Sequence, residues 1–338
     1  MHYLIYIILP LIIFNLIILI NFDKIENKIN LYDFPDVKRK LHKYKTPLLG
    51  GLIIYVNIIL FVPLIYFLGD ISYFSNSNIY TLKQFIFFLF TLSLIFFIGI
   101  YDDKFGLSFE KRLLYIFISL MLFANYNPQF NINNINIETL NIFFKVNTIS
   151  PLILSICIIT YIISCNMFDG IDIQSPLYFL FILLLLIYKN ILVDLNIFLL
   201  IPLITVFYLN FIKKTFFGDS GIYLIGFLIA YSFVSGYNKN LISLEEIFLI
   251  TFPQIFDAAR VILMRLLKGK NPTIPDRTHI HHILIKKKNL MLTVSLISMI
   301  YIFPILIFYI FEINILILII FQILLYFFIL NYNNAKRF

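Results

Sequence analysis

Long apolar stretches separated by short polar segments run through most of this chain. Many approach 20 residues, the length that a helix needs to cross the hydrocarbon core of a bilayer. Polar residues, Gly and Pro divide the pattern into candidate helices. These eleven lie near residues 3–22, 48–68, 82–101, 112–126, 149–165, 174–188, 192–212, 220–237, 242–263, 290–311 and 313–332. The pattern predicts an all-α polytopic membrane protein with about eleven transmembrane helices, the fourth and sixth of them short.

The composition agrees with that class. Of 338 residues, 61% are hydrophobic and 13% are charged, which is far from the balance of a soluble domain. We interpret residues 1–338 as a single transmembrane domain whose polar motifs lie between residues 33 and 282. The first apolar stretch has no small-residue cleavage site, so we expect it to remain as a span.

The positions of the basic residues indicate an orientation. With the N-terminus outside, 22 of the 26 Lys and Arg residues fall in inward-facing segments, and four fall in outward-facing loops. Because cytoplasmic loops carry the excess of positive charge, we expect an outside N-terminus and a cytoplasmic C-terminus. The excess of Lys and Arg in the inward-facing segments accounts for the net charge of +8, and no nucleic-acid partner is expected.

The same orientation brings five polar patches to the cytoplasmic side. They span residues 33–51, 101–112, 166–172, 213–221 and 269–282. The largest outer loop, residues 125–148, is rich in Asn and Ile. We interpret it as a connector without evident chemistry, in which a short hairpin could form.

Acidic residues at the mouths of the predicted helices are candidates for phosphate and metal chemistry. Asp102 and Asp103 follow an apolar run, and two adjacent carboxylates raise each other's pKa unless a cation intervenes. A solvated helix end is the alternative. Asn166, Asp169 and Asp172 recur every three residues, so they can share a helix face and offer oxygen ligands to Mg²⁺ or to a nucleotide. A polar turn is the alternative there.

Asp219 lies in a Gly-Asp-Ser-Gly segment that opens the next predicted helix. It is either an ordinary N-cap or a carboxylate that presents a metal to a phosphate beside free backbone N–H groups.

Two basic patches complete the set. The first contains Lys40 and His42, and a basic segment of this kind most often contacts anionic lipid headgroups. The second contains Arg277 with His279, His281 and His282. Zinc is disfavoured there because no Cys is near and the neighbours are cationic, so an anionic phosphorylated substrate fits better. Asp257 and Arg260, one helical turn apart, are interpreted as a structural ion pair.

In order and spacing, the five patches resemble the motifs of the polyprenyl-phosphate N-acetylhexosaminyl-1-phosphate transferase superfamily, glycosyltransferase family 4. The final Pro-Asp-x-x-His-x-His-His form is similar to the WecA/TagO-like branch. The matching residues are Asp33, Pro35, Arg39, Lys40, His42, Pro47, Gly50 and Gly51; Asp102, Asp103 and Arg112; Asn166, Asp169, Gly170 and Asp172; Gly218 to Gly221; and Pro275, Asp276, His279, His281 and His282. The chain departs from the family pattern at Ile163, Ile173 and Ile222, where the family has small or polar residues.

The resemblance implies an inner-membrane enzyme that joins a cytoplasmic UDP-N-acetylhexosamine to a lipid phosphate, undecaprenyl phosphate being expected. It implies Mg²⁺ as cofactor, with Mn²⁺ as a substitute, and Asp219 and Asn166 as metal ligands. Asp102 and Asp103 would act on the lipid phosphate or assist the metal, and Asp169 and Asp172 would face the nucleotide. The implied phosphate-binding residues are His279, His281, His282, Arg277, Lys40, His42 and Arg112.

The alternative from another class is a transporter or channel for a cation or a phosphorylated solute. Acidic residues within membrane helices are typical of such proteins. Here the acidic residues gather at cytoplasmic helix ends, and no inverted repeat is evident in the sequence. The sugar, the downstream glycan pathway and the oligomeric state, a homodimer among the options, stay open.

Overall fold

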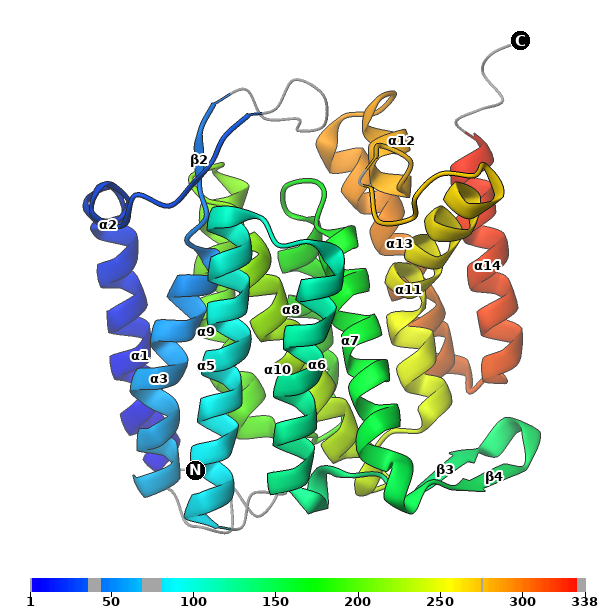
Figure 1. The fold of residues 1–338 in the computed structure, drawn as a ribbon, viewed down its shortest axis with the longest axis horizontal. Coiled ribbons are helices and arrows are strands. Elements are labelled where there is room, and N and C mark those ends of the chain that lie inside the picture. Colours follow the sequence, from blue (N-terminus) through cyan, green and yellow to red (C-terminus); the bar gives the residue numbers. More distant parts are fainter. Residues whose placement is uncertain (1, 36–43, 69–80, 275, 333–338) are drawn as a thin grey trace.

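The computed structural model describes residues 2–35, 44–68, 81–274 and 276–332. Figure 1 shows a bundle of roughly parallel helices with small hairpins at its two ends. The helices are α1 (His2–Ile20), α2 (Phe22–Ile29), α3 (Gly50–Leu68), α5 (Leu82–Phe105), α6 (Phe109–Tyr126), α7 (Ser150–Phe168), α8 (Gln174–Tyr188), α9 (Val193–Phe211), α10 (Gly218–Asn238), α11 (Leu244–Leu267), α12 (Ile280–Ile285), α13 (Leu290–Phe311) and α14 (Ile315–Tyr332).

Each of the eleven predicted segments overlaps a helix, which confirms an all-α membrane architecture. Among the described residues, six helices are long and apolar enough to cross a membrane, or seven if the bent α1–α2 pair is one span. Three further apolar helices, within α3, α8 and α14, fall below that length over the residues that the structure fully describes. The first turn of α6 contains Glu110, Lys111 and Arg112, so it is too polar for the hydrocarbon core. The count of eleven spans and the sides of the termini stay predictions.

The first predicted span does not continue straight. The chain turns by 72° between α1 and α2, at Asn21, whose side-chain amide donates to the carbonyl of Ile17 at 3.0 Å. Helix α2 carries Lys24 and Lys28 beside apolar residues, and Figure 1 shows it end-on above α1, at one edge of the bundle. Such an amphipathic helix suits the plane of the membrane interface.

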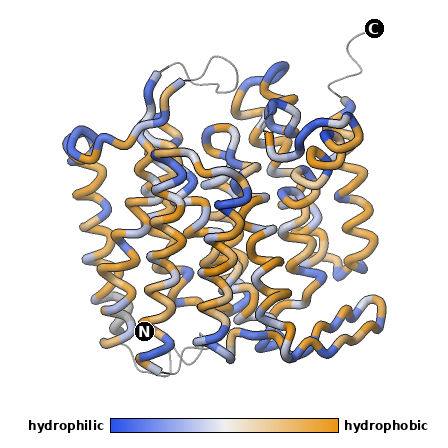
Figure 2. The backbone as a smooth tube through the Cα atoms, in the orientation of Figure 1, coloured by the Kyte–Doolittle hydropathy of each residue, from blue (hydrophilic) through white to orange (hydrophobic). Residues whose placement is uncertain are grey.

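Helix α10 forms the centre of the bundle. Within its most apolar window, 94% of the residues are buried, and it packs against α5, α7 and α3. Small residues along α10, Gly and Ser above all, let neighbouring backbones approach closely, as in other membrane bundles. Figure 2 shows apolar residues along the length of the helices, with polar residues gathered toward the two ends of the bundle.

The predicted glycine pair of the first patch serves this packing. The N–H groups of Gly50 and Gly51 donate to the carbonyls of Phe216 and Phe217. A Cβ on Gly51 would overlap the backbone of Gly221. The start of α3 is therefore held against the start of α10, beside the short strands β1 (Tyr32–Asp33) and β2 (Thr46–Pro47), which pair antiparallel.

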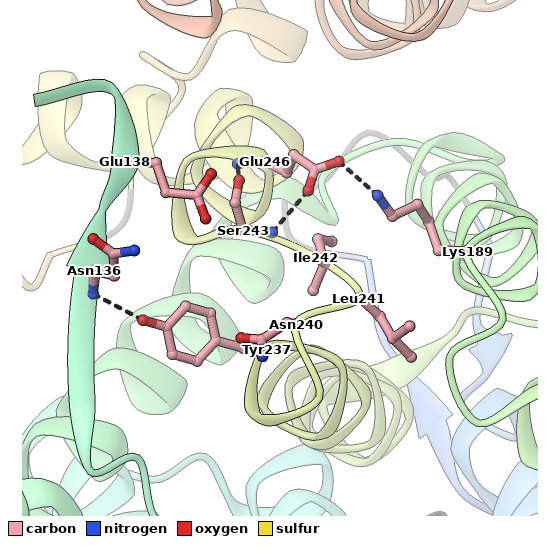
Figure 3. A pocket seen from close by; sticks show the side chains of 9 residues that line it. All are labelled: Asn136, Glu138, Lys189, Tyr237, Asn240, Leu241, Ile242, Ser243 and Glu246. Atoms are coloured by element: carbon pink, nitrogen blue, oxygen red, sulfur yellow. Dashed lines mark hydrogen bonds and ion pairs between the residues drawn. The ribbon is translucent and has the colours of Figure 1, made fainter. Parts of the chain in front are cut away.

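The largest outer loop does form a hairpin, with antiparallel strands β3 (Asn134–Ile137) and β4 (Ile142–Lys145). It lies at the end of the bundle opposite α12 (Figure 1). Figure 3 shows a polar pocket of about 200 Å³ between this hairpin and the α10–α11 turn, in which Lys189 pairs with Glu246 at 2.9 Å. This end contains none of the predicted motif residues that the structure describes.

Candidate active site

The two adjacent aspartates lie within the last turn of α5, which continues four residues beyond the predicted boundary. Asp102 is buried, and both of its carboxylate oxygens are bound. Arg112 of α6 approaches at 2.8 Å, the Tyr223 hydroxyl donates at 2.7 Å, and the Leu107 N–H donates at 2.7 Å. These contacts link Asp102 of α5 to α6 and α10. The main structural role of its carboxylate is to orient Arg112.

Asp103 caps the start of α10. Its carboxylate accepts hydrogen bonds from the backbone N–H groups of Asp219 at 2.7 Å and Ser220 at 3.1 Å. The first N–H groups of a helix have no partner within the helix, and a carboxylate there also complements the helix dipole. Asp103 therefore sets the position of the turn that carries Asp219.

Asp219 is joined to α6 and α7 through one amide. The Asn166 side-chain nitrogen donates to Asp219 Oδ1 at 2.5 Å, and the Asn166 oxygen accepts from Arg112 at 3.3 Å. Asp102, Arg112, Asn166 and Asp219 thus form a continuous polar chain across four helices. Its residues lie far apart in sequence, yet they meet at one end of the bundle.

Asp169 ends α7 and begins the turn that leads to α8. Removal of its carboxylate from water raises its pKa to about 7, and the charges of Asp219 and Asp172 add to the effect. The turn ends at Ile173, whose φ of 73° is unusual for a β-branched residue. The Ile173 N–H donates to Asn210 Oδ1 at 2.6 Å, which helps to hold this conformation.

The histidine segment packs against this turn. A Cβ on Gly170 would overlap the ring of His281, so glycine is required for the contact. The His279 and His281 rings stack with centroids 5.6 Å apart, and the His282 ring lies 4.2 Å from that of His281. Burial and neighbouring positive charge lower the pKa of His281 well below its usual value and that of His282 to about 4. These two rings are neutral at neutral pH and can give hydrogen bonds rather than charge.

The predicted pair of Asp257 and Arg260 is confirmed at 2.7 Å. The structure adds a partner that sequence analysis missed, because Asp257 also approaches His279 Nδ1 at 2.7 Å. Tyr223 was missed as well, since tyrosine counts as hydrophobic in a membrane-helix pattern. The one signal for Tyr223 in the sequence is its hydroxyl group, which lies in the predicted helix that follows the Asp219 motif.

Most of the predicted site residues therefore gather at one end. Asp172 acts electrostatically on Asp169, and Arg277 acts on His282. Lys40 and His42, with Pro275, lie outside the described residues.

The acidic residues at this end carry the type of ligand atom that a hard divalent cation prefers. Asp103, Asp169 and Asp219 offer carboxylate oxygens, which Mg²⁺ prefers, and the charge that raises the pKa of Asp169 is one that a cation would neutralise. In the described part of the chain, no group of three His, Cys, Asp or Glu residues surrounds a common metal position. The Asn166 oxygen faces Arg112, so ligation by that oxygen requires the amide to turn over. Metal binding at Asp219 and Asn166 stays a prediction.

At the three departures from the family pattern, the isoleucine side chains pack in hydrophobic clusters. Ile163 and Ile222 are buried in the main hydrophobic core, and Ile173 packs with Ile171 and Val294 in a smaller cluster.

Fold and site together define a multi-pass helical membrane protein with a carboxylate-rich centre at one end of its bundle. Residues 85–237 match the model of glycosyl transferase family 4.

Curated relatives agree. The chain is 25% identical over 297 residues to the undecaprenyl-phosphate alpha-N-acetylglucosaminyl 1-phosphate transferase of Escherichia coli O157:H7, covering 78% of this chain and 71% of the relative. It is 24% identical to the probable undecaprenyl-phosphate N-acetylglucosaminyl 1-phosphate transferase of Bacillus subtilis, covering 77% and 71%. A shorter match to the Haemophilus influenzae transferase is 36% identical over 76 residues, 22% of this chain and 21% of the relative. These matches confirm the family resemblance that the five motifs predict.

Proposed function

We propose that this protein transfers N-acetylhexosamine 1-phosphate from a UDP-sugar to undecaprenyl phosphate, producing a polyprenyl-diphosphate sugar and UMP. Relatives that cover most of the chain carry this type of activity in their names. The reaction would be the first membrane step of a cell-envelope glycan, such as a wall polymer or lipopolysaccharide.

The observation that carries the proposal is the polar chain from Asp102 through Arg112 and Asn166 to Asp219. Four helices would hold it at the level where a lipid phosphate lies, while the prenyl chain stays in the bilayer. A soluble nucleotide and a membrane-bound acceptor can meet only at such a boundary. We place this end at the cytoplasmic face of the inner membrane, in line with the distribution of basic residues.

The chemistry brings two anions together. An oxygen of the lipid phosphate forms a bond to the β-phosphorus of the UDP-sugar, and the bond from that phosphorus to the bridging oxygen breaks as UMP leaves. Mg²⁺, when bound, would neutralise the diphosphate and stabilise the leaving UMP.

Each residue has a role that its surroundings support. Asp219 would hold the cation, with Asn166 as a second ligand, and Asp103 would keep Asp219 in place through the start of α10. Asp102 would aim Arg112, whose guanidinium also reaches Asn166. Asp169 and Asp172 would face the nucleotide.

The basic motifs would bind phosphate. The neutral rings of His281 and His282 would donate N–H groups to phosphate oxygens, beside the charge of Arg277. Lys40 and His42 would act from the segment after β1.

The alternative is a transporter or channel. Its support is general, namely buried carboxylates within membrane helices. The connections of Asp103 and Asp102 argue against it, because both carboxylates are bound to backbone or to Arg112 and are held in fixed positions.

The deciding experiment uses purified protein with undecaprenyl phosphate, Mg²⁺ and a panel of labelled UDP-sugars. Lipid-extractable label with equimolar UMP supports the proposal, and loss of both in Asp219→Asn supports the role of Asp219. A matched control is Glu138→Gln, an acid at the other end of the bundle. Solute flux in proteoliposomes without UMP release would favour the transporter. Replacement of Mg²⁺ by Mn²⁺, and removal by a chelator, test the cofactor.

A further inference from the structure

A buried hydrogen-bond network joins the histidine segment to the C-terminal helix. At its centre is Asp257 of α11, of which 2% is exposed. Asp257 Oδ2 contacts His279 Nδ1 at 2.7 Å, and its Oδ1 accepts from the Tyr326 hydroxyl of α14 at 2.5 Å. Arg260 donates to Asp257 Oδ1 at 2.7 Å. One carboxylate is therefore shared by two helices and by the first histidine of the motif.

The network also fixes the backbone next to that histidine. The Ile280 N–H donates to Asp257 Oδ1 at 3.3 Å, and Arg260 donates to the carbonyl of Thr278 at 2.8 Å. The residues on both sides of His279 are thus bound to the same α11 pair. This arrangement fixes the position of the histidine segment relative to α11.

The contact at Nδ1 has a chemical consequence. A carboxylate can only accept a hydrogen bond, so His279 must carry its proton on Nδ1 in this arrangement. Nε2 is then the other ring nitrogen, which Asp257 does not contact. A carboxylate that fixes the tautomer and orientation of a functional imidazole is a recurring device in enzymes.

Tyr326 and Arg260 in turn hold the carboxylate. Tyr326 is fully buried, and Arg260 Nε donates to its hydroxyl at 2.6 Å. Asp257, Arg260 and Tyr326 form a closed triangle, so the carboxylate has no room to rotate away from His279. Tyr326 lies beyond the last motif and beyond the matched residues 85–237.

We propose that Asp257 and Tyr326 are positioning residues that hold His279 as the Nδ1–H tautomer. The ring held in this way stacks on His281, which in turn packs against the Asp169–Gly170 turn. The C-terminal helix α14 is then part of the functional site and not only a membrane anchor. The inference rests on the proposed function in one respect, since His279 matters to activity only if it serves phosphate transfer.

The first test does not depend on activity. The chain has five histidines, so the purified protein can be labelled with ¹⁵N-histidine and its ring nitrogens assigned with a His279→Gln variant. At pH 8 we expect a protonated Nδ1 on His279 in the wild type and a mixture of tautomers in Asp257→Asn. A wild-type His279 protonated only on Nε2 would overturn the inference.

The second test is kinetic. In Asp257→Asn we expect kcat/KM to fall roughly 10–100-fold, by analogy with the loss seen when the hydrogen-bond partner of a metal-binding histidine is mutated. In Tyr326→Phe, which keeps the carboxylate, we expect a smaller loss that lies mainly in kcat. The Asp257→Glu variant should recover part of the activity, because it restores a carboxylate, which can only accept, whereas the Asn amide can also donate.

A matched pair at the other end of the bundle provides the control. Tyr309 donates to Glu246 at 2.9 Å, so Tyr309→Phe removes an equivalent hydrogen bond far from the histidines, and Glu246→Gln takes away only the charge of its acceptor. They should lower stability without changing the His279 tautomer or kcat. Wild-type kinetics in folded Asp257→Asn and Tyr326→Phe would overturn the inference. If the wild type itself transfers no sugar phosphate, the proposed function fails and the tautomer measurement alone decides this inference.

Discussion

The carboxylate of Asp103 accepts a hydrogen bond from the backbone N–H of Asp219 at 2.7 Å, across 116 positions of sequence. One aspartate therefore caps the helix that presents the other. This relationship makes the adjacent acids of α5 unequal, because Asp103 supports α10 while Asp102 binds Arg112 and Tyr223. Their separate tasks were not visible in the sequence, where the two look equivalent.

Replacing Asp103 should reduce activity much more than stability. In Asp103→Ala the first turn of α10 loses its cap, which costs about 0.5–2 kcal/mol. A displacement of Asp219 by about 1 Å is enough to lower the rate roughly 10²-fold. Thermal unfolding and UMP release measure the two effects. Asp23→Ala, which removes an exposed partner of Lys214, is the control and should leave both unchanged. Activity close to wild type in Asp103→Ala would contradict this role.

Arg112 should matter to both folding and activity. Its partner Asp102 has a side chain that is 1% exposed, so Arg112→Ala leaves a buried charge unpaired at a cost of about 3–5 kcal/mol. Lys189→Ala breaks a similarly placed pair with Glu246 at the other end of the bundle. Both variants should unfold at lower temperature, whereas only Arg112→Ala should lose turnover per folded molecule. Equal losses of turnover would show that the effect is structural.

Gly170→Ala should disturb the histidine segment. The added methyl group would overlap the buried ring of His281, and overpacking of this kind costs about 1–3 kcal/mol. We expect weaker binding of the UDP-sugar, measured as a higher KM. Gly226→Ala on α10 is the control, since its Cβ would lie 3.2 Å from Ile162 Cγ1, a far milder contact than the overlap at Gly170. An unchanged KM in Gly170→Ala would place the histidines away from the donor.

The low pKa of His282 predicts a loss of stability in acid. The pKa falls from 6.5 to about 4 in the folded protein, so the unfolded chain takes up the proton first as the pH drops. The contribution of the neutral ring to the free energy of unfolding is complete above pH 6.5 and is lost as the pH approaches 4. Thermal unfolding at pH 7.5 and pH 5 should show a smaller acid shift in His282→Gln than in the wild type. The same shift in both proteins would argue against a buried neutral ring.

The orientation can be checked by labelling single cysteines with a membrane-impermeant reagent. The chain's own Cys157 and Cys165 would first be replaced by serine. Cysteines at the exposed positions Lys104 and Lys268 should label only from the cytoplasm, and one at the exposed Lys145 only from outside. Labelling of Lys104→Cys and Lys268→Cys from opposite sides would separate the acidic and histidine motifs and refute a shared site.

Local pattern was sufficient for the helices and for the candidates. Apolar runs predicted the positions of α5, α7 and α10 to within a few residues, because a helix in a membrane must satisfy its own backbone hydrogen bonds. The predicted helix boundaries were less accurate at the candidate site. Asp102 and Asn166 were expected to lie beyond helix ends, and both are in the last turns of helices that run further.

The number of spans could not be derived in the same way. A run of apolar residues is a similar signal whether the helix crosses the membrane, bends at Asn21 as α1 and α2 do, or stops short as α8 does. Length and flanking polarity separate these cases only when the neighbouring helices are known.

The amino-acid sequence by itself determined the class of the protein and predicted the candidate side chains and their position at one end of the bundle, since hydropathy and charge are properties of short segments. Only the tertiary structure decided which of these side chains touch. The contacts of Asp103 with Asp219, of Gly170 with His281, and of Tyr326 with Asp257 join residues on different helices. Such pairings depend on how helices pack, and packing is set by the fit of whole surfaces that no single motif contains.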